Sequence, residues 1–137
     1  MNLLNFVMQE WWLFGLLAAL IMAYSWSERI KSGLPISTHE LTTLLNTEKA
    51  VVLDIRPATE FKAGHLVGAF NISYEKVNSD LNVLDKYKNQ IIIVVDKMGQ
   101  HSGHIGRLLA KQGYDVRRLS GGISEWQNQN LPLIKGK

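Results

Sequence analysis

The residues best suited to chemistry lie in one short stretch, residues 96–102. In order they are Asp96, Lys97, Met98, Gly99, Gln100, His101 and Ser102. Such a run of polar groups and glycine, placed between a strand and a helix, forms a loop whose backbone amides point inward. The helix dipole adds positive potential, so we expect this loop to hold an anion, and the carboxylate of Asp96 can itself be that anion.

The elements on either side of the loop are predicted from apolar spacing. Residues 91–95 are five consecutive β-branched apolar residues, which are typical of a central strand buried on both faces of a parallel sheet. Ile105, Leu108 and Leu109 then recur at helical spacing, and Gly113 ends the predicted helix. The loop therefore lies at the carboxyl end of a central strand, where α/β proteins place their sites.

The sequence allows cysteine chemistry, an aspartyl-phosphate mechanism and a metal site to be assessed for this loop. The chain contains no cysteine, which excludes disulfides, thiolate metal sites and cysteine nucleophiles. An aspartyl-phosphate mechanism needs a metal and a second acidic pair, whereas Lys97 and Met98 follow Asp96. Asp96, His101 and His104 are possible metal ligands, but solvated histidines at the start of a helix are more common, so we predict neither a metal nor a cofactor. A histidine near an acid can also sense pH.

The rest of the chain predicts the same fold class. Strands are expected over residues 50–55, 67–72 and 116–119 in addition to 91–95, and helices alternate with them. Helices are expected to start near Ser37 or Thr38, after Pro57 and after Ser102. A further helix is expected over residues 74–87, and another around Trp126. This alternation predicts an α/β fold with a mostly parallel sheet flanked by helices.

Composition limits the partners. The 137 residues are 46% hydrophobic and 20% charged, which suits one globular domain. The net charge is +3, but the basic residues are spread among the acids, so we predict no nucleic-acid partner.

The amino-terminal segment, residues 3–26, is predicted to be a transmembrane helix in contact with the lipid bilayer. Its only ionisable side chain is Glu10, and residues 11–24 are uninterrupted apolar or small residues. That run is short for a span, so residues 3–8 must join it with Glu10 near an interface. Trp11 and Trp12 at one end, and Tyr24 and Trp26 at the other, resemble the aromatic belts of spanning helices.

The flanking charges predict the orientation of this helix. Arg29 and Lys31 follow it and no basic side chain precedes it, so the positive-inside rule places the amino terminus outside and the carboxyl-terminal domain in the cytoplasm. A cleaved signal peptide fits this segment less well than a transmembrane helix does, because the charged n-region and the A-x-A cleavage site of signal peptides are missing. A buried amphipathic helix is disfavoured because large apolar residues occupy every face. Residues 27–34 are a short connector, and residues 35–134 form the domain.

Four spaced blocks in this domain resemble the rhodanese domain, the α/β fold of sulfurtransferases and their inactive relatives. They are Val52 to Pro57 with Glu60-Phe61; Gly64-His65-Leu66-Val67-Gly68-Ala69 with Asn71-Ile72; Gly99 and Ser102; and Gly121-Gly122-Ile123 with Trp126 and Leu131-Pro132. The match covers about residues 34–133, with Val67 where proline is usual. The single anchor and the chain ending also resemble a group of small bacterial membrane rhodanese-like proteins, which implies the bacterial inner membrane.

The resemblance implies which residues are structural and which are active. Asp54, Arg56, Gly64, His65, Gly68, Gly121, Gly122 and Trp126 form the structural signature. From the residues themselves, we expect Asp54 and Arg56 to pair with neighbouring loops, His65 to hydrogen-bond backbone and Trp126 to cover the sheet.

The active loop departs from the family pattern. Rhodaneses transfer sulfur through a cysteine thiolate that becomes a persulfide, and the resemblance places Asp96 at that cysteine position. His101 stands where active relatives often carry arginine. The related phosphatase branch also requires a loop cysteine. We therefore expect no catalytic residue and no sulfur transfer.

The function we predict is a non-catalytic, membrane-tethered interaction or regulatory module. It would meet a protein partner, with membrane proteins among the candidates, through residues 96–102 at the cytoplasmic face. The alternatives are an enzyme of the sulfurtransferase class, or a small-anion sensor that uses the same loop.

Overall fold

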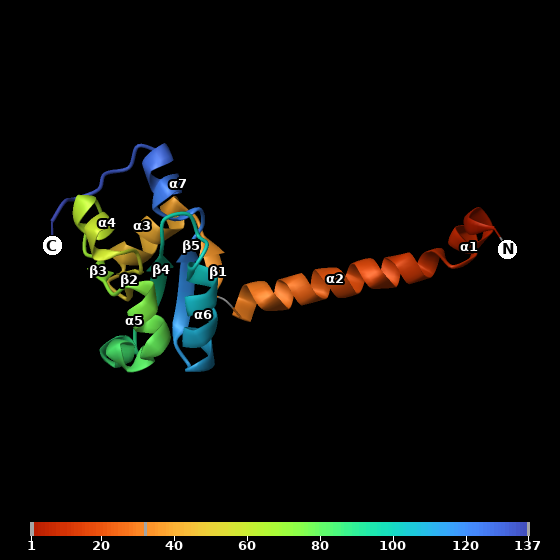
Figure 1. The fold of residues 1–137 in the computed structure, drawn as a ribbon, viewed down its shortest axis with the longest axis horizontal. Helices are drawn as coiled ribbons and strands as arrows, with labels where there is room; N and C mark the ends of the chain where they lie inside the picture. Colours follow the sequence, from red (N-terminus) through yellow and green to blue (C-terminus); the bar gives the residue numbers. More distant parts are fainter. Residues whose placement is uncertain (1, 32, 137) are drawn as a thin grey trace. The chain divides into compact units, whose positions relative to one another are not determined.

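The computed structural model describes residues 2–31 and 33–136, and the side chains of residues 28–31, including Arg29 and Lys31, lie outside the described part. The chain divides into two compact units, residues 1–30 and residues 31–137. The first unit holds the helices α1 (Leu3–Gln9) and α2 (Trp11–Lys31), the latter extending to the boundary (Figure 1). The second unit holds the remaining elements.

The predicted single helix over residues 3–26 is interrupted at Glu10. Glu10 ends α1 with the non-helical backbone angles φ −110° and ψ 23°, and its side chain accepts a hydrogen bond from the indole of Trp12. The axes of Leu3–Gln9 and Trp11–Ser27 are bent by 67°. Among the described residues, no single helix has the length and apolar composition of a membrane span, whereas this bent pair meets both criteria when its helices are counted together.

The second unit is built on one parallel sheet, as the sequence predicts. Its strands are β1 (Leu34–Ile36), β2 (Ala50–Asp54), β3 (Phe70–Asn71), β4 (Ile91–Val95) and β5 (Asp115–Leu119). They lie in the order β1-β5-β4-β2-β3, and every neighbouring pair is parallel. The predicted strand at 91–95 is therefore the central one. The sequence expectation of an α/β fold with helices flanking a parallel sheet is confirmed.

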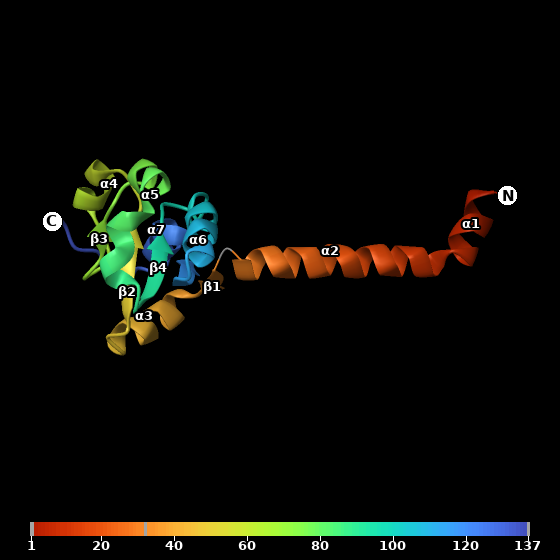
Figure 2. The same cartoon turned by 90° about the horizontal axis from the view of Figure 1, so that it is seen from below.

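The helices cover both faces of the sheet (Figures 1 and 2). They are α3 (Thr38–Asn46), α4 (Ala58–Ala63), α5 (Tyr74–Ser79), the 3₁₀ helix η1 (Leu81–Tyr87), α6 (Ser102–Lys111) and α7 (Gly122–Asn128). Helix α3 begins at Ser37, whose hydroxyl accepts from the Glu40 amide while the Glu40 carboxylate accepts from the Ser37 amide. This capping box satisfies two amide donors at the helix start.

The alternation of side chains along β4 divides the core in two. Ile93 and Val95 pack in one cluster with residues of α3 and α7. Ile92 and Val94 pack in the other with residues of α5, η1 and α6. Because a strand with both faces covered must be apolar throughout, the uninterrupted run at 91–95 has a direct structural cause.

Three predicted elements differ from the structure. The strand expected at 67–72 is reduced to Phe70–Asn71, because Gly68 adopts φ +80° and turns the chain. The helix expected at 74–87 breaks at Asp80, whose extended backbone and side-chain bond to the Asn82 amide start a separate 3₁₀ helix. Within the connector expected at 27–34, residues 27–31 belong to α2 and Leu34 is the first residue of β1.

Candidate functional site

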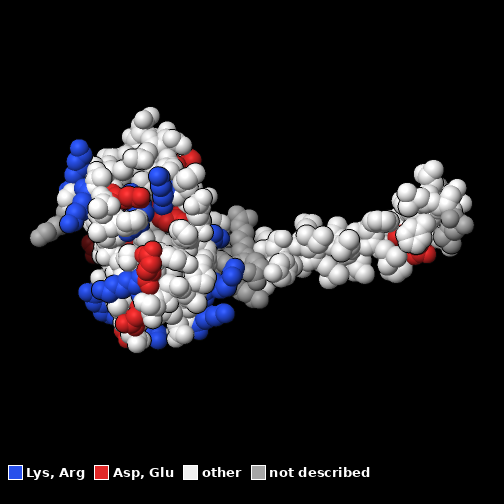
Figure 3. Space-filling view, in the orientation of Figure 1, with Lys and Arg blue, Asp and Glu red and all other residues white. Residues whose placement is uncertain are grey.

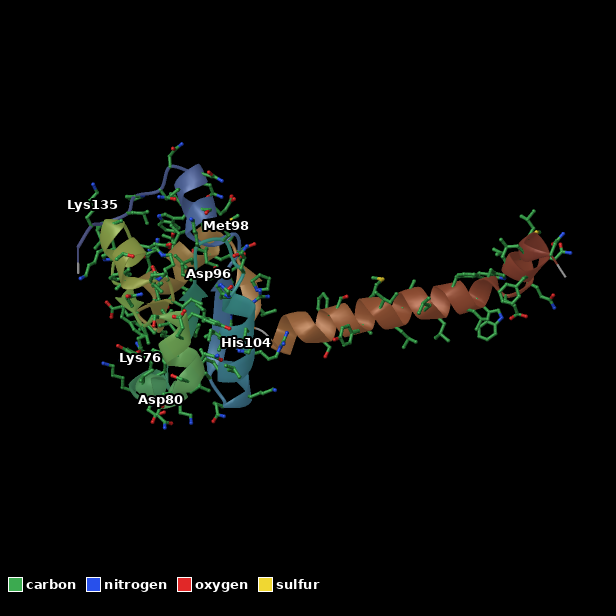
Figure 4. All side chains as sticks on the ribbon, in the orientation of Figure 1. Lys76, Asp80, Asp96, Met98, His104 and Lys135 are labelled. Carbon is green, nitrogen blue, oxygen red and sulfur yellow. The ribbon has the colours of Figure 1, made fainter. Side chains whose placement is uncertain are left out.

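Asp96 is the first residue after β4 (Figure 4), and its carboxylate accepts hydrogen bonds from amides of the loop that follows. Oδ1 accepts a hydrogen bond from the Gly99 amide at 2.5 Å. Oδ2 accepts from the amides of His101 at 2.6 Å and Ser102 at 3.2 Å. Asp96 is only 4% exposed. The loop amides therefore converge on a carboxylate that the chain itself supplies.

The loop closes through Gly99 and Ser102. Gly99 has φ +92°, a left-handed conformation that glycine adopts without strain. The Ser102 hydroxyl donates to the Gly99 carbonyl oxygen at 3.4 Å, and Ser102 is the first residue of α6. The Asp96 carboxylate thus lies against the amino end of a ten-residue helix, where a negative charge is stabilised by the unpaired amides and the helix dipole.

Helix α7 holds the backbone of the same loop from the other side. The amide of Ile123 donates to the carbonyl oxygen of Asp96 at 2.9 Å, and the amide of Ser124 donates to that of Lys97 at 2.9 Å. A Cβ on Gly122 would lie 2.5 Å from the Asp96 carbonyl oxygen, and one on Gly121 would lie 2.7 Å from Cβ of Glu125. The missing side chain of Gly122 allows α7 to approach the loop this closely, whereas Gly121 makes room for Glu125 within α7.

A buried ion pair organises the loop after β2. Arg56 donates to both carboxylate oxygens of Asp54 at 2.8–3.1 Å and to the carbonyl oxygen of Gly64 at 2.7 Å. The side-chain amide of Asn71 donates to the carbonyl oxygens of Asp54 and Arg56, both at 2.9 Å. Because their hydrogen-bonding groups are directed at one another and at backbone, Asp54 and Arg56 fix loop geometry.

His65 and Trp126 attach the carboxyl-terminal segment to the domain. His65 exchanges backbone hydrogen bonds of 2.9 Å with Ile134, its Nδ1 lies 2.8 Å from the Phe61 carbonyl oxygen, and its ring stacks on Phe61 at 3.8 Å. The Trp126 indole donates to the Pro132 carbonyl oxygen at 3.0 Å. Both residues are buried and both contact the core or backbone.

A cavity of about 230 Å³ lies beside the loop. Arg56 from the loop after β2 and Glu60 from α4 contribute to its lining. Helix α5 contributes Tyr74 and Glu75, and the Asp96 loop contributes four residues. The rings of Tyr74 and His101 are 4.6 Å apart and form part of one wall. Acidic, basic and aromatic side chains therefore line a cavity beside a loop in which the amides of Gly99, His101 and Ser102 already donate to Asp96.

Comparison with known proteins identifies the fold family. The sequence model of the rhodanese-like domain matches residues 37–129. The chain belongs to the rhodanese-like domain family. YibN of Escherichia coli K12 is 33% identical over 129 residues, which cover 92% of this chain and 88% of YibN. The thiosulfate sulfurtransferase GlpE of Shewanella oneidensis is 30% identical over 96 residues, covering 69% of this chain and 93% of GlpE.

A solved structure shows the same fold. The crystal structure of a rhodanese-related protein from Thermoplasma volcanium superposes with a TM-score of 0.65 at 22% identity, covering 73% of this chain and 96% of that one. At 22% identity this similarity shows a shared fold and does not show a shared activity.

The rhodanese-like domain brings some of the predicted site residues together and not others. Arg56 lines the cavity beside Asp96, and Gly64 lines a second cavity of about 250 Å³ with Lys97. Gly122 lies against the loop, since a Cβ on it would be 2.5 Å from the Asp96 carbonyl oxygen, and the Gly121 amide nitrogen lies 3.9 Å from where a Cβ on Gly99 would be. Gly68, His65 and Trp126 line neither cavity.

Tyr74 and Glu75 were missed as site residues. The sequence predicts Tyr74 only as the start of a helix, because nothing in residue spacing shows that α5 faces the loop after β4. Tyr74 lies between His101 and His104, whose rings are 4.6 and 6.0 Å from its own, and His104 Nε2 lies 2.9 Å from Oδ1 of Asn78. Within the described part of the chain, no three His, Cys, Asp or Glu side chains are grouped so that they could hold a metal ion.

Proposed function

We propose that this chain is a membrane-tethered rhodanese-like module without sulfur-transfer activity, which contacts a protein partner at the cytoplasmic face. The observation that carries the proposal is that the Asp96 carboxylate accepts hydrogen bonds from the amides of Gly99, His101 and Ser102. These are the donors that an anionic intermediate or an anionic ligand would need.

The chemistry of sulfur transfer supports the absence of activity. The reaction needs a thiolate that accepts a sulfane sulfur and passes it on as a persulfide. We assign Asp96 to the position of that thiolate, and a carboxylate can do neither step. The chain contains no cysteine that could act in place of Asp96. A sulfurtransferase role and an anion-sensor role both require amides that Asp96 already occupies, so neither is favoured.

Two assays on the full-length protein in detergent test this proposal. Thiosulfate-to-cyanide transfer should not exceed a protein-free blank, with an active sulfurtransferase as positive control. In parallel, sulfate should raise the melting temperature of Asp96→Ala more than that of the wild type, because the variant frees the amides. Catalysed turnover by the wild type would overturn the proposal, and an equal sulfate response would show that Asp96 does not block the anion position.

The proposed membrane tether rests on the amino-terminal unit. The bent pair of α1 and α2 has the apolar length of a span, tryptophans at its junction and Tyr24 and Trp26 toward the other end. The basic residues Arg29 and Lys31 follow the span in sequence, which supports a cytoplasmic domain. Protease added to intact cells should leave residues 34–137 uncut, and should cut them after membrane rupture. Cleavage in intact cells would refute the orientation.

The proposed partner surface is the outer side of the Asp96 loop. Lys97, Met98 and Gln100 are exposed there, and Met98 is 57% exposed at the loop tip (Figure 4). Lysines and arginines are interspersed with acids over the visible face of the domain, which does not favour a nucleic-acid partner (Figure 3).

A photocrosslinking residue at position 98 tests this surface in native membranes. The matched control places the same residue at Asn89, which is also exposed but lies at the opposite ends of the strands, beside Ile91. The expected result is a discrete crosslinked protein from position 98 that is absent from position 89. Identical products from both positions would refute a partner site at the loop.

A further inference from the structure

Helix α1 has a polar face made of amide side chains. Asn2, which caps the helix, Asn5 and Gln9 are spaced by three and four residues, so they lie on one side of an α-helix. The other positions are apolar and exposed: Leu3, Leu4, Phe6, Val7 and Met8. The helix is therefore amphipathic and has no charged side chain of its own.

The bend separates this amphipathic helix from α2. Glu10 leaves helical geometry at the junction, and its Oε2 accepts a hydrogen bond of 3.1 Å from the Trp12 indole. A carboxylate and indole N–H groups are stable at the polar boundary of a bilayer, where tryptophan is enriched, and not in its hydrocarbon core. The junction itself thus has the chemistry of a membrane–water interface.

Without α1, the described part of helix α2 falls a few ångström short of a bilayer core of about 30 Å. The described stretch Trp11–Ser27 has 17 residues, and at a rise of about 1.5 Å per residue it extends about 26 Å. This is the lower end of what a bilayer core requires, and small mismatches are accommodated by local thinning. A span that began at α1 would instead place Glu10 and the amides of Asn5 and Gln9 in hydrocarbon.

We infer that α1 lies in the plane of the membrane interface, with Leu4 and Val7 toward the acyl chains and Asn5 and Gln9 toward water, while α2 alone crosses. The occupant of the apolar face of α1 is thus the lipid surface. The inference rests on the proposed tether but not on its orientation. Because α1 has no basic side chain, its attachment depends on buried apolar area and not on attraction to anionic lipids.

The cysteine-free sequence allows a direct test by site-specific labelling. Single variants Asn5→Cys, Val7→Cys, Gln9→Cys and Ala18→Cys are made in the full-length protein and placed in phosphatidylethanolamine–phosphatidylglycerol vesicles. A membrane-impermeant maleimide is supplied on both sides, and each labelling rate is divided by the rate in denaturing detergent. We expect positions 5 and 9 to react several-fold faster than position 7, with Ala18→Cys in mid-α2 protected.

The other outcomes separate the inference from the tether. If the labelling rate changes steadily from position 5 through 7 to 9, or if all three positions are protected from labelling, α1 continues the span. Either result would overturn the inference but leave the proposed tether intact. Rapid labelling of all three with position 18 protected would show α1 free in water and would also overturn it. Rapid labelling of position 18 would refute the tether itself.

Discussion

The backbone amide of His101 lies 2.6 Å from Oδ2 of Asp96, so the loop after β4 is closed by a side chain from its own first residue. The carboxylate occupies the position in which an external anion would accept hydrogen bonds from the same amides. The conformation of the loop is therefore set during folding and does not depend on a bound ligand.

The first prediction concerns Asp96→Asn. Asparagine has nearly the same size, but it is neutral and one of the two Asp96 oxygens becomes an NH₂ group facing amide donors. We expect the free energy of unfolding to fall by about 2 kcal/mol, since hydrogen bonds to charged acceptors contribute about 1.5–3 kcal/mol. Urea unfolding measures the loss. Asp115→Asn is the control, because its pairing with Arg117 is exposed and should contribute less than about 1 kcal/mol. Equal losses would contradict a closed loop.

The second prediction concerns the contact between α7 and the loop. In Gly122→Ala the new Cβ would lie 2.5 Å from the Asp96 carbonyl oxygen and 2.7 Å from the Lys97 carbonyl, in addition to the strain of φ +63°. In the control Gly113→Ala, φ is +89° but no atom lies within 4 Å of the Cβ. The control should lose about 1 kcal/mol and Gly122→Ala about 3 kcal/mol or more. Similar losses would show that α7 can move away freely.

The third prediction concerns the ion pair of Asp54 and Arg56, whose side chains are 1% and 8% exposed. Asp54→Ala leaves a buried guanidinium without its carboxylate, so we expect a loss of about 3–5 kcal/mol. The double variant Asp54→Ala/Arg56→Met should be more stable than Asp54→Ala alone, because the unpaired charge is removed. A double-mutant cycle with additive losses would disprove the coupling.

The fourth prediction is a pH dependence from Tyr114. Burial, followed by the charge of Asp85 and a hydrogen bond of 3.3 Å to its carboxylate, raises the pKa of Tyr114 above 10.0. The folded state then keeps the proton longer than the unfolded state, so stability is complete below pH 10 and falls as pH rises through the folded pKa. Tyr114→Phe should lose about 1 kcal/mol near neutrality but should lack this alkaline decline. Parallel pH profiles of the two proteins would refute the shift.

The sequence predicts the centre of the fold well and its margins less well. Residues 91–95 could be placed as the central strand because only a strand covered on both faces is apolar throughout. Strand β1 was missed because Leu34-Pro35-Ile36 is three residues long and contains a proline, so its pairing with β5 depends on tertiary structure.

The candidate site shows the same limit. Spacing and glycine content suffice to predict that residues 96–102 form an amide-lined loop, because these are local properties. They do not reveal that Tyr74 faces His101 or that Ile123 donates to the Asp96 carbonyl, because those contacts join distant segments. The break at Glu10 was also not predicted, since hydropathy averages over a window and is insensitive to one backbone angle.

The order of the strands has a consequence for biosynthesis. Strand β1 pairs with β5, so the first strand of the domain to leave the ribosome must wait for the last. About 80 residues separate them, which at about 5–20 residues per second is a delay of roughly 4–16 s. Throughout that interval Leu34–Ile36 is a nascent segment with no partner strand, and a chaperone or the translocation machinery has that long to act on it before the sheet is complete.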